Sequence, residues 1–414
     1  MTIIYFLTSL LSVAALAGEC ELKEDVVATL KACIPNIEVR ALGPEVSDPK
    51  RKYYEVFFQQ AVDHQNPQSG TFRQRLVLAH RNYSEPMILQ TSGYAIFRIA
   101  PSGLTTMFDT NQIQVEHRFF ADSVPQPTDW SKLDIRQSAA DFHAITESFK
   151  KVYQKAWVNT GGSKGGMTSV YHRRFYPADL DGTVANVAPH SFSDWDERYI
   201  DFVDNVGGEK YQSCRAKLAD VQTRLLQNRE KLQAQISGNF EFLGGKDLAY
   251  EHGVQEMVYY FWQYKSPEDP QVGCNRIPKA EDSDDALLNF FQAINPLDDN
   301  YGEGLKDFVS YYFQAATELG GPGIKRSHLQ DLLKHPFRWD MYTPKGVSIN
   351  YSNTSMVDVE KWLADSGEKI MMVYGEYDPW SAGMFKPCGR DCHWYTVPKE
   401  NHRANLTLLP TAQK

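Results

Sequence analysis

The residues best suited to chemistry stand in the motif GGSKG at positions 161–165, where glycines flank a serine. A strand-like stretch, residues 156–160, precedes the motif, and a helical pattern follows it. Such a strand-to-helix turn lifts a serine hydroxyl clear of a sheet, and the glycines avoid clashes in the tight bend. Ser163 is therefore the predicted nucleophile. A phosphate-binding loop is disfavoured, because Lys164 is followed by Gly165 and not by Ser or Thr.

Backbone N–H groups must stabilise the oxyanion that forms when a serine attacks a carbonyl. The N–H of Lys164 is one expected donor, because it follows the nucleophile at the start of a helix whose dipole favours negative charge. The second donor is expected from the loop after an early strand. We assign it to the N–H of Tyr94, with Gly93 as the alternative.

A serine nucleophile needs an orienting acid and a base, which follow it in the chain order Ser, acid, His. Asp378 stands in a turn after the strand-like segment 369–374 and is the predicted acid, with Glu376 as the competitor. Two histidines come later. His393 begins a predicted strand and is interpreted as structural, whereas His402 follows that strand and is the predicted base.

Glu116 ends another strand-like segment, at the edge of the sheet where binding sites form. Its carboxylate could hold a substrate ammonium group through charge-assisted hydrogen bonds. The alternative is a local ion pair with Arg118. From the residues alone, the ion pair is the favoured interpretation.

The elements that position these residues follow an α/β pattern. Segments 53–58 and 72–79 are rich in β-formers with turn residues between them, which predicts an antiparallel hairpin. Apolar residues at helical spacing between 133 and 152 predict an amphipathic helix packed on a sheet. Alternating strands and helices predict an α/β sheet with helices on both faces. Further strands are expected at 86–90, 112–116, 156–160, 182–188, 369–374 and 393–397.

Strand patterns nearly vanish between about residues 192 and 365, where helical patterns take over. We expect a helical insertion over 192–365, between sheet-forming parts at 18–191 and 366–414. Helices are predicted at 209–235, 247–265, 282–294, 305–319 and 328–333.

Composition excludes several classes of protein. The 414 residues are 42% hydrophobic and 23% charged, which is typical of a globular chain rather than a disordered one. The net charge of −9 lacks the basic character of a nucleic-acid binder. No internal apolar run reaches the ~20 residues of a membrane span.

The N-terminal segment and the cysteines indicate the compartment. Residues 1–17 are predicted as a cleavable secretory signal, with a short membrane anchor as the alternative. Six cysteines then favour disulfides, and we expect sequence neighbours to pair: Cys20 with Cys33, Cys214 with Cys274, and Cys388 with Cys392. Glycosylation sequons stand at Asn82, Asn350, Asn353 and Asn405.

The motifs GGSKGGM at 161–167, EHR at 116–118 and DPWSAG at 378–383 together resemble the secreted prolyl tripeptidyl aminopeptidase family of serine peptidases. The lysosomal Pro-X carboxypeptidase and dipeptidyl peptidase II family is a more distant match. The resemblance implies an α/β-hydrolase core with a large helical cap inserted before the acid turn. It also implies a triad of Ser163, Asp378 and His402, and exopeptidase action near proline.

The resemblance changes the interpretation of two further residues. In the related dipeptidyl peptidases the glutamate of the EHR motif contacts the substrate amino terminus, so amine binding by Glu116 becomes as good an interpretation as the ion pair. Lys164 stands where the distant relatives have an aromatic residue. This lysine is expected to add a charge beside the site.

We therefore expect a secreted serine exopeptidase that releases short peptides, tripeptides first of all, from free amino termini. A secreted esterase or lipase-like hydrolase with the same triad is the alternative, and a catalytically inactive binding protein is a third. A polar group that holds an amine near the cleft would favour peptides, whereas a wholly apolar pocket would favour esters. No metal is expected, because no C-x-x-C or H-E-x-x-H motif is present, and the proposed chemistry needs no cofactor. The net charge and the lack of a long internal apolar run predict neither a nucleic-acid partner nor a membrane span.

Overall fold

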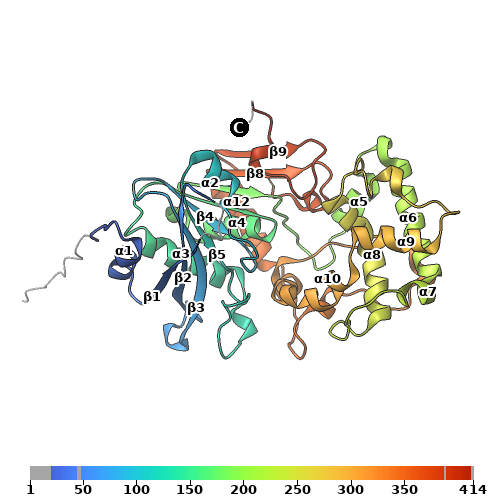
Figure 1. The fold of residues 1–414 in the computed structure, drawn as a ribbon, viewed down its shortest axis with the longest axis horizontal. Helices are drawn as coiled ribbons and strands as arrows, with labels where there is room; N and C mark the ends of the chain where they lie inside the picture. Colours follow the sequence, from blue (N-terminus) through green and yellow to red (C-terminus); the bar gives the residue numbers. More distant parts are fainter. Residues whose placement is uncertain (1–19, 44–47, 387, 412–414) are drawn as a thin grey trace, which may run out of the picture.

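The computed structural model describes residues 20–43, 48–386 and 388–411, so the predicted signal at 1–17 lies outside the described residues. Two lobes are visible in Figure 1: a sheet with its flanking helices on the left, and a helical lobe on the right. The last strands of the sheet, coloured red, lie at the top of the sheet lobe, so the chain returns to it after the helical lobe.

The described strands form one sheet with the order β1-β2-β3-β5-β4-β6-β7-β8-β9. The six strands from β5 to β9 in this order are parallel, whereas β1, β2 and β3 pair antiparallel with one another and β3 pairs antiparallel with β5. The strands are β1 (Ile37–Ala41), β2 (Lys52–Ala61), β3 (Thr71–His80), β4 (Met87–Thr91), β5 (Asn111–Val115), β6 (Trp157–Gly162), β7 (Gly182–Asn186), β8 (Ile370–Gly375) and β9 (Cys392–Val397).

The predicted hairpin is confirmed, since β2 and β3 pair over their whole length from Lys52 opposite His80 to Ala61 opposite Thr71. The inner strands β4, β5 and β6 are short and buried, as expected of parallel strands covered on both faces. The sheet with its α/β order and its serine turn after β6 is an α/β-hydrolase core, which confirms the predicted fold class.

One face of the sheet is covered by more helices than the other. One face packs against α1 (Val26–Cys33), α3 (Ile135–Phe149), α4 (Lys164–Phe175) and α12 (Thr354–Ser366). On the other face, α2 (Gly103–Phe108) and the segment around Leu406 cover Ile88, Val184 and Val373. The predicted helix at 133–152 is α3; Asp134 caps it by accepting a hydrogen bond from the N–H of Gln137.

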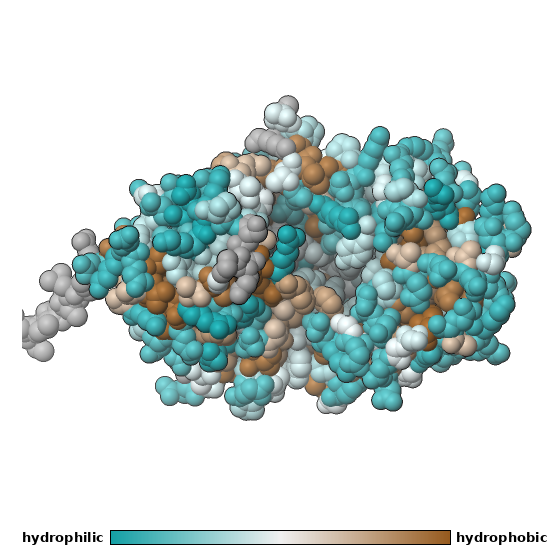
Figure 2. Space-filling view, viewed as in Figure 1, coloured by the Kyte–Doolittle hydropathy of each residue, from teal (hydrophilic) through white to brown (hydrophobic). Residues whose placement is uncertain are grey.

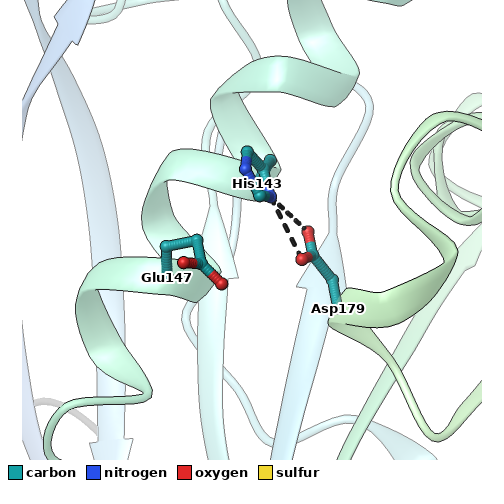
Figure 3. A group of neighbouring side chains, drawn as sticks. All are labelled: His143, Glu147 and Asp179. Carbon is teal, nitrogen blue, oxygen red and sulfur yellow. Dashed lines mark hydrogen bonds and ion pairs between the residues drawn. The ribbon is translucent and has the colours of Figure 1, made fainter.

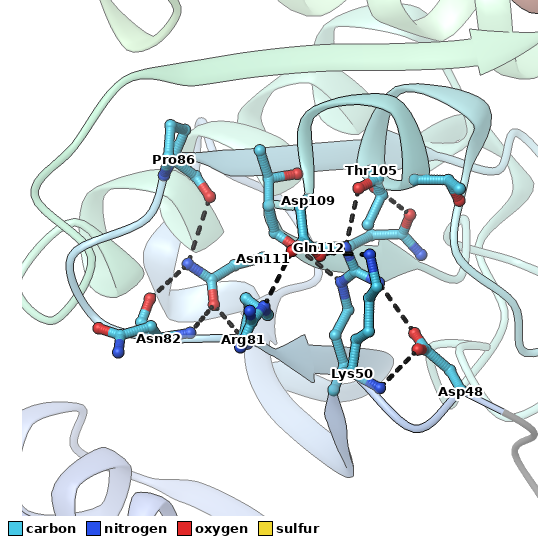
Figure 4. A network of polar contacts seen from close by, with 12 residues as sticks. Asp48, Lys50, Arg81, Asn82, Pro86, Thr105, Asp109, Asn111 and Gln112 are labelled. Atoms are coloured by element: carbon cyan, nitrogen blue, oxygen red, sulfur yellow. Dashed lines mark hydrogen bonds and ion pairs between the residues drawn. The ribbon is translucent and has the colours of Figure 1, made fainter.

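Asn111 anchors the start of β5 to the loop that follows β3, as Figure 4 shows. Its Nδ2 donates to the carbonyl groups of Asn82 and Pro86, and its Oδ1 accepts from the N–H of Arg81 at 2.7 Å. A buried polar side chain is stable only when its hydrogen bonds are satisfied. This network therefore holds the two ends of the loop before β4 in place.

The helical lobe, residues 198–342, lies between β7 and β8 in the sequence and has a hydrophobic core of its own. We call this lobe the cap. Leu218 and Leu225 of α6 pack there with Val254 and Phe261 of α8, all fully buried. The cap helices are α5 (Arg198–Asn205), α6 (Gln212–Gln227), α7 (Arg229–Gln233), α8 (Lys246–Tyr264), α9 (Asp284–Ile294), α10 (Leu297–Tyr301) and α11 (Val309–Gln314), followed by a π-helix at Ala315–Leu319.

The boundaries of the insertion differ from the expected 192–365. Helix α12 falls inside that range, but Met356, Val359 and Leu363 pack against α4 and β8 of the sheet lobe. The helical periodicity of α12 resembles that of the cap helices, so sequence alone does not tell which lobe the helix joins. The helices expected at 305–319 and 328–333 are in part 3-10 or π turns rather than α-helix.

All three predicted disulfides are present in the structure: Cys20–Cys33, Cys214–Cys274 and Cys388–Cys392. The face seen in Figure 2 is largely hydrophilic, with hydrophobic residues in several separate patches. Among the described residues, no helix combines the length and the apolar character needed to cross a bilayer.

Candidate active site

Ser163 occupies a strained turn between β6 and α4. Its φ of 56° and ψ of −128° lie in a region that non-glycine residues rarely adopt. A hydrogen bond to the neighbouring strand β7 holds the turn, since the N–H of Ser163 donates to the carbonyl of Asn186 at 2.9 Å. A Cβ on Gly161 would lie 2.3 Å from the backbone of Gly165, and this close approach requires glycine in the bend.

The loop after β4 lies directly on the first turn of α4. Gly93 has a φ of +76°, and a Cβ there would lie 2.5 Å from the nitrogen of Gly165. The hydroxyl of Thr91 donates to the carbonyl of Gly165 at 2.7 Å. Tyr94 follows Gly93, and its carbonyl accepts from the N–H of His117 at 3.0 Å. The two expected oxyanion donors, Tyr94 and Lys164, thus come from two segments in direct contact.

Asp378 and His402 are brought together at the ends of β8 and β9. Nδ1 of His402 lies 2.7 Å from Oδ2 of Asp378, whose side chain is fully buried. The other carboxylate oxygen, Oδ1, accepts from the N–H of Trp380 at 3.0 Å. Glu376, the competitor for the acid role, instead accepts from the N–H of Lys399 at the surface.

The structure does not join His402 to Ser163 by a hydrogen bond. Within the described part of the chain, Nε2 of His402 is buried and has no hydrogen-bond partner. The imidazole lies beside Tyr264 and Trp380, with ring centroids 6.2 Å away in each case, and both of these residues line the cavity above Ser163. Catalytic hydrogen bonds are often long in unliganded enzymes and tighten when substrate binds.

A cavity lies between the sheet lobe and the cap, directly above the serine. The sheet lobe contributes Tyr94, Ser163 and Trp380 among others. From the cap, α8 contributes one face at helical spacing: Glu256, Tyr259, Tyr260, Gln263 and Tyr264. Other tyrosines of the lining, Tyr311 and Tyr312, come from α11. The cavity is therefore aromatic, with a single carboxylate on its cap side.

Glu116 does not line this cavity. Its carboxylate is 1% exposed and accepts from the N–H groups of Ile96 and Asp122 and from the hydroxyl of Ser123. Arg75, rather than the expected Arg118, is its basic neighbour, at 3.4 Å. The structure thus does not support a role of Glu116 in binding substrate, because the fold itself takes up both carboxylate oxygens.

Glu256 was missed by the sequence reasoning. It is 5% exposed, and Oε1 accepts from the hydroxyl of Tyr342 at 2.9 Å. Burial raises the pKa of its carboxyl to about 8, and hydrogen bonds from Tyr342 and Tyr301 lower it only in part. The signal that the sequence held was an acidic residue directly before the apolar and aromatic run 257–262 of α8.

Glu256 is also exceptional among the buried acids. Of the nine buried Asp and Glu residues in the described chain, eight have a Lys, Arg or His nitrogen within 3.4 Å. Glu256 has none among the described residues. A buried carboxylate without a basic partner is costly unless a ligand supplies the charge.

A second group of ligand-type side chains lies between α3 and the turn after α4 (Figure 3). Nδ1 of His143 and Nε2 of His172 each lie 2.9 Å from Asp179, while Glu147 is exposed. Burial raises the pKa of Asp179, but the bonds from the two histidines outweigh it and lower the pKa overall. These contacts explain why the side chains gather here: the carboxylate of Asp179 is shared by the two imidazoles. The group lies on the face of the sheet that α3 and α4 cover.

The sequence from residue 29 to residue 414 matches the family model described as PS-10 peptidase S37. The chain belongs to this family. It is a serine peptidase with an α/β-hydrolase core, as the resemblance implied. The chain is 38% identical over 373 residues to the prolyl tri/tetrapeptidyl aminopeptidase of Streptomyces mobaraensis, a match that covers 86% of this chain and 77% of that protein.

This S37 peptidase is also similar, more weakly, to two other proteins. The prolyl carboxy peptidase like protein 5 of Caenorhabditis elegans is 29% identical over 167 residues, 35% of this chain and 33% of that protein. The crystal structure of VinJ is 11% identical, covers 88% of this chain and 92% of its own, and superposes with a TM-score of 0.42. That score is too low to add to the argument from the sheet topology.

Proposed function

We propose that this S37 peptidase is an aminopeptidase that removes tripeptides from free amino termini, with Ser163 as nucleophile, His402 as base and Asp378 as orienting acid. In this mechanism Ser163 attacks the scissile carbonyl while His402 takes its proton and later delivers it to the leaving amine. Asp378 accepts from Nδ1 and so leaves Nε2 free to take the proton of the serine. The backbone N–H groups of Lys164 and Tyr94 hold the oxyanion.

The observation that carries the proposal is the lone carboxylate of Glu256 in the same cavity as Ser163. We assign to Glu256 the amine-binding role that the sequence reasoning gave to Glu116. A substrate ammonium group would supply the positive charge that Glu256 lacks, and the hydrogen bond would be charge-assisted. A carboxylate in the cavity favours peptides over the esters of the alternative function, for which a wholly apolar pocket is expected.

The length of the released peptide follows from the position of Glu256 on α8. Tyr264 lies beside His402, and Glu256 precedes it by eight residues on the same face of the helix. Eight residues of α-helix span about 12 Å. Three extended residues span about 10–11 Å, so a chain held by its amine at Glu256 brings its third peptide bond near the catalytic histidine.

Preference for proline is part of the proposal. The aromatic side chains of the cavity, such as Tyr259, Tyr264 and Trp380, offer apolar surfaces that suit a pyrrolidine ring. The similarity to the prolyl tri/tetrapeptidyl aminopeptidase supports this preference. Export is also proposed, on the predicted signal at 1–17 and on the three disulfides, which persist in oxidising compartments.

The test compares peptides that differ only in a free or an acetylated amino terminus, each with proline at the third position. We expect the wild-type enzyme to release tripeptides from the free form, as read by mass spectrometry, and to cleave the blocked form poorly. Equal cleavage of both forms would contradict the aminopeptidase proposal.

Two matched variants locate the amine site. Glu256→Gln should lower the ratio of kcat/KM between free and blocked peptides by at least about 30-fold, because losing one partner of a buried charge pair costs at least ~2 kcal/mol. Glu116→Gln removes a carboxylate that the fold uses internally, and should leave the ratio unchanged. The opposite pattern would return the amine-binding role to Glu116.

A further inference from the structure

The side chain of Lys164 makes a contact that neither the triad nor the cavity requires. It is 2% exposed, and Nζ donates a 2.7 Å hydrogen bond to the carbonyl oxygen of Gly93. The rings of Tyr94 and Phe120 lie 5.7 and 5.3 Å from Nζ. The sequence predicted a charge beside the site; in the structure the side chain is enclosed by the loop after β4.

The carbonyl that Lys164 binds belongs to the peptide unit whose nitrogen is that of Tyr94. This unit is planar, and in the trans form its C=O and N–H point in opposite directions. A donor fixed on the carbonyl oxygen of Gly93 therefore fixes the direction of the Tyr94 N–H, which points away from Nζ. The same bond polarises the amide and strengthens its N–H as a donor.

The surrounding contacts leave this peptide little other freedom. Gly93 lies so close to α4 that a Cβ would be 2.7 Å from the carbonyl carbon of Lys164. On the far side of the unit, the Tyr94 carbonyl accepts from the N–H of His117 at 3.0 Å. The hydrogen bond from Lys164 thus sets the rotation of the Gly93–Tyr94 peptide plane, which lies between α4 and His117.

We propose that Lys164 is a positioning residue of the oxyanion hole: its backbone N–H is one donor, and its side chain aims and polarises the other, the N–H of Tyr94. The inference rests on the proposed function, in which these two groups hold the tetrahedral intermediate. Burial lowers the pKa of the Lys164 amine well below its ordinary value. Both the ammonium and the neutral amine carry N–H groups, so either form can make the bond to Gly93.

The test is Lys164→Met, which keeps the length of the side chain and removes the donor. On a free-amine Ala-Ala-Pro p-nitroanilide, we expect kcat per titrated active site to fall by about 10- to 100-fold, since loss of one oxyanion donor outright costs 10²- to 10³-fold. KM should stay within about twofold, because the bond acts on the transition state. The affinity for Ala-Ala-prolinal, which forms a tetrahedral adduct with the serine, should fall by the same factor as kcat/KM.

Thr168→Val is the matched control. Its buried hydroxyl donates to the backbone carbonyl of Lys164 at 2.8 Å on the same helix and, among the described residues, forms no hydrogen bond with Gly93. We expect a lower melting temperature with unchanged kcat per titrated site. Loss of kcat and of prolinal affinity in this control to the same degree as in Lys164→Met would overturn the proposal, since a general weakening of α4 would then explain both.

A Lys164→Met enzyme with wild-type kcat per site and wild-type prolinal affinity would also overturn it. If the Met variant yields too little folded protein, Lys164→Leu, which is shorter and also lacks a donor, should show the same parallel loss; unchanged values would contradict the proposal. A wild-type enzyme that fails to cleave the free-amine substrate would instead contradict the proposed function, so the two failures are distinguishable.

Discussion

Nδ1 of His402 lies 2.7 Å from Oδ2 of Asp378, and the loop that carries this histidine is tied to the cap. The N–H of His402 donates to the carbonyl of Gln263 at 3.1 Å, and Nδ2 of Asn401 donates to that of Lys265 at 3.2 Å. Both acceptors stand at the end of α8, the helix that carries Glu256. The position of the proposed base is thus linked to the helix that lines the substrate cavity.

Asp378→Asn should lower kcat by about 10³- to 10⁴-fold with little change in fold, because an amide favours the wrong imidazole tautomer. The measurement is kcat on a tripeptidyl p-nitroanilide, with circular dichroism to check the fold. Glu376→Gln is the control, since its carboxylate only accepts from the N–H of Lys399 at the surface. If Glu376→Gln lost more activity than Asp378→Asn, the acid would be misassigned.

Most of the sheet was predictable because its signals are local. The hairpin of β2 and β3, the helix α3 and the serine turn each depend on residue types and spacing within a short stretch. Asp378 and His402 were found through chain order and turn position. No strand was predicted for β1 and no helix for α1, where polar residues interrupt the short apolar pattern.

The parts of the site that the sequence left open or missed depend on tertiary packing. The pairing of β3 with β5 decides whether the side chain of Glu116 points toward the cavity or toward Arg75. The spacing of residues along one strand does not contain this information. Glu256 lines the same cavity as Ser163 only because the cap folds back over the sheet, across almost a hundred residues of sequence. The side chain of Lys164 was expected to be a charge beside the site because nothing local reveals the carbonyl of Gly93.

The contribution of Glu256 to the stability of the protein should fall as the pH rises from about 4.5 to about 8. Its pKa is about 8 in the folded protein against an ordinary value of 4.5, so in this window the folded state binds a proton that the unfolded state does not. The contribution of Glu256 to the free energy of unfolding then decreases with rising pH. In urea unfolding, the free energy of unfolding of Glu256→Gln should gain on that of the wild type as the pH rises, with the largest gain near pH 8; a difference that does not change with pH would contradict this.

Removal of the Cys214–Cys274 disulfide should destabilise the chain more than removal of Cys388–Cys392. The first closes a loop with a sequence separation of 60 and the second one of 4. Loop entropy gives roughly 4 and roughly 2 kcal/mol respectively. Double Cys→Ala variants in chemical denaturation measure both; a larger loss for the short loop would show that entropy of the unfolded chain is not the main effect.

The most direct test of the central claim is to label the active enzyme with a fluorophosphonate and locate the adduct by mass spectrometry. We expect one stoichiometric adduct, on Ser163, that appears in step with the loss of peptidase activity. Ser163→Ala should take up no label and cleave no peptide while it keeps the wild-type melting temperature. An adduct on another residue, or peptide cleavage that persists in Ser163→Ala, would contradict the account.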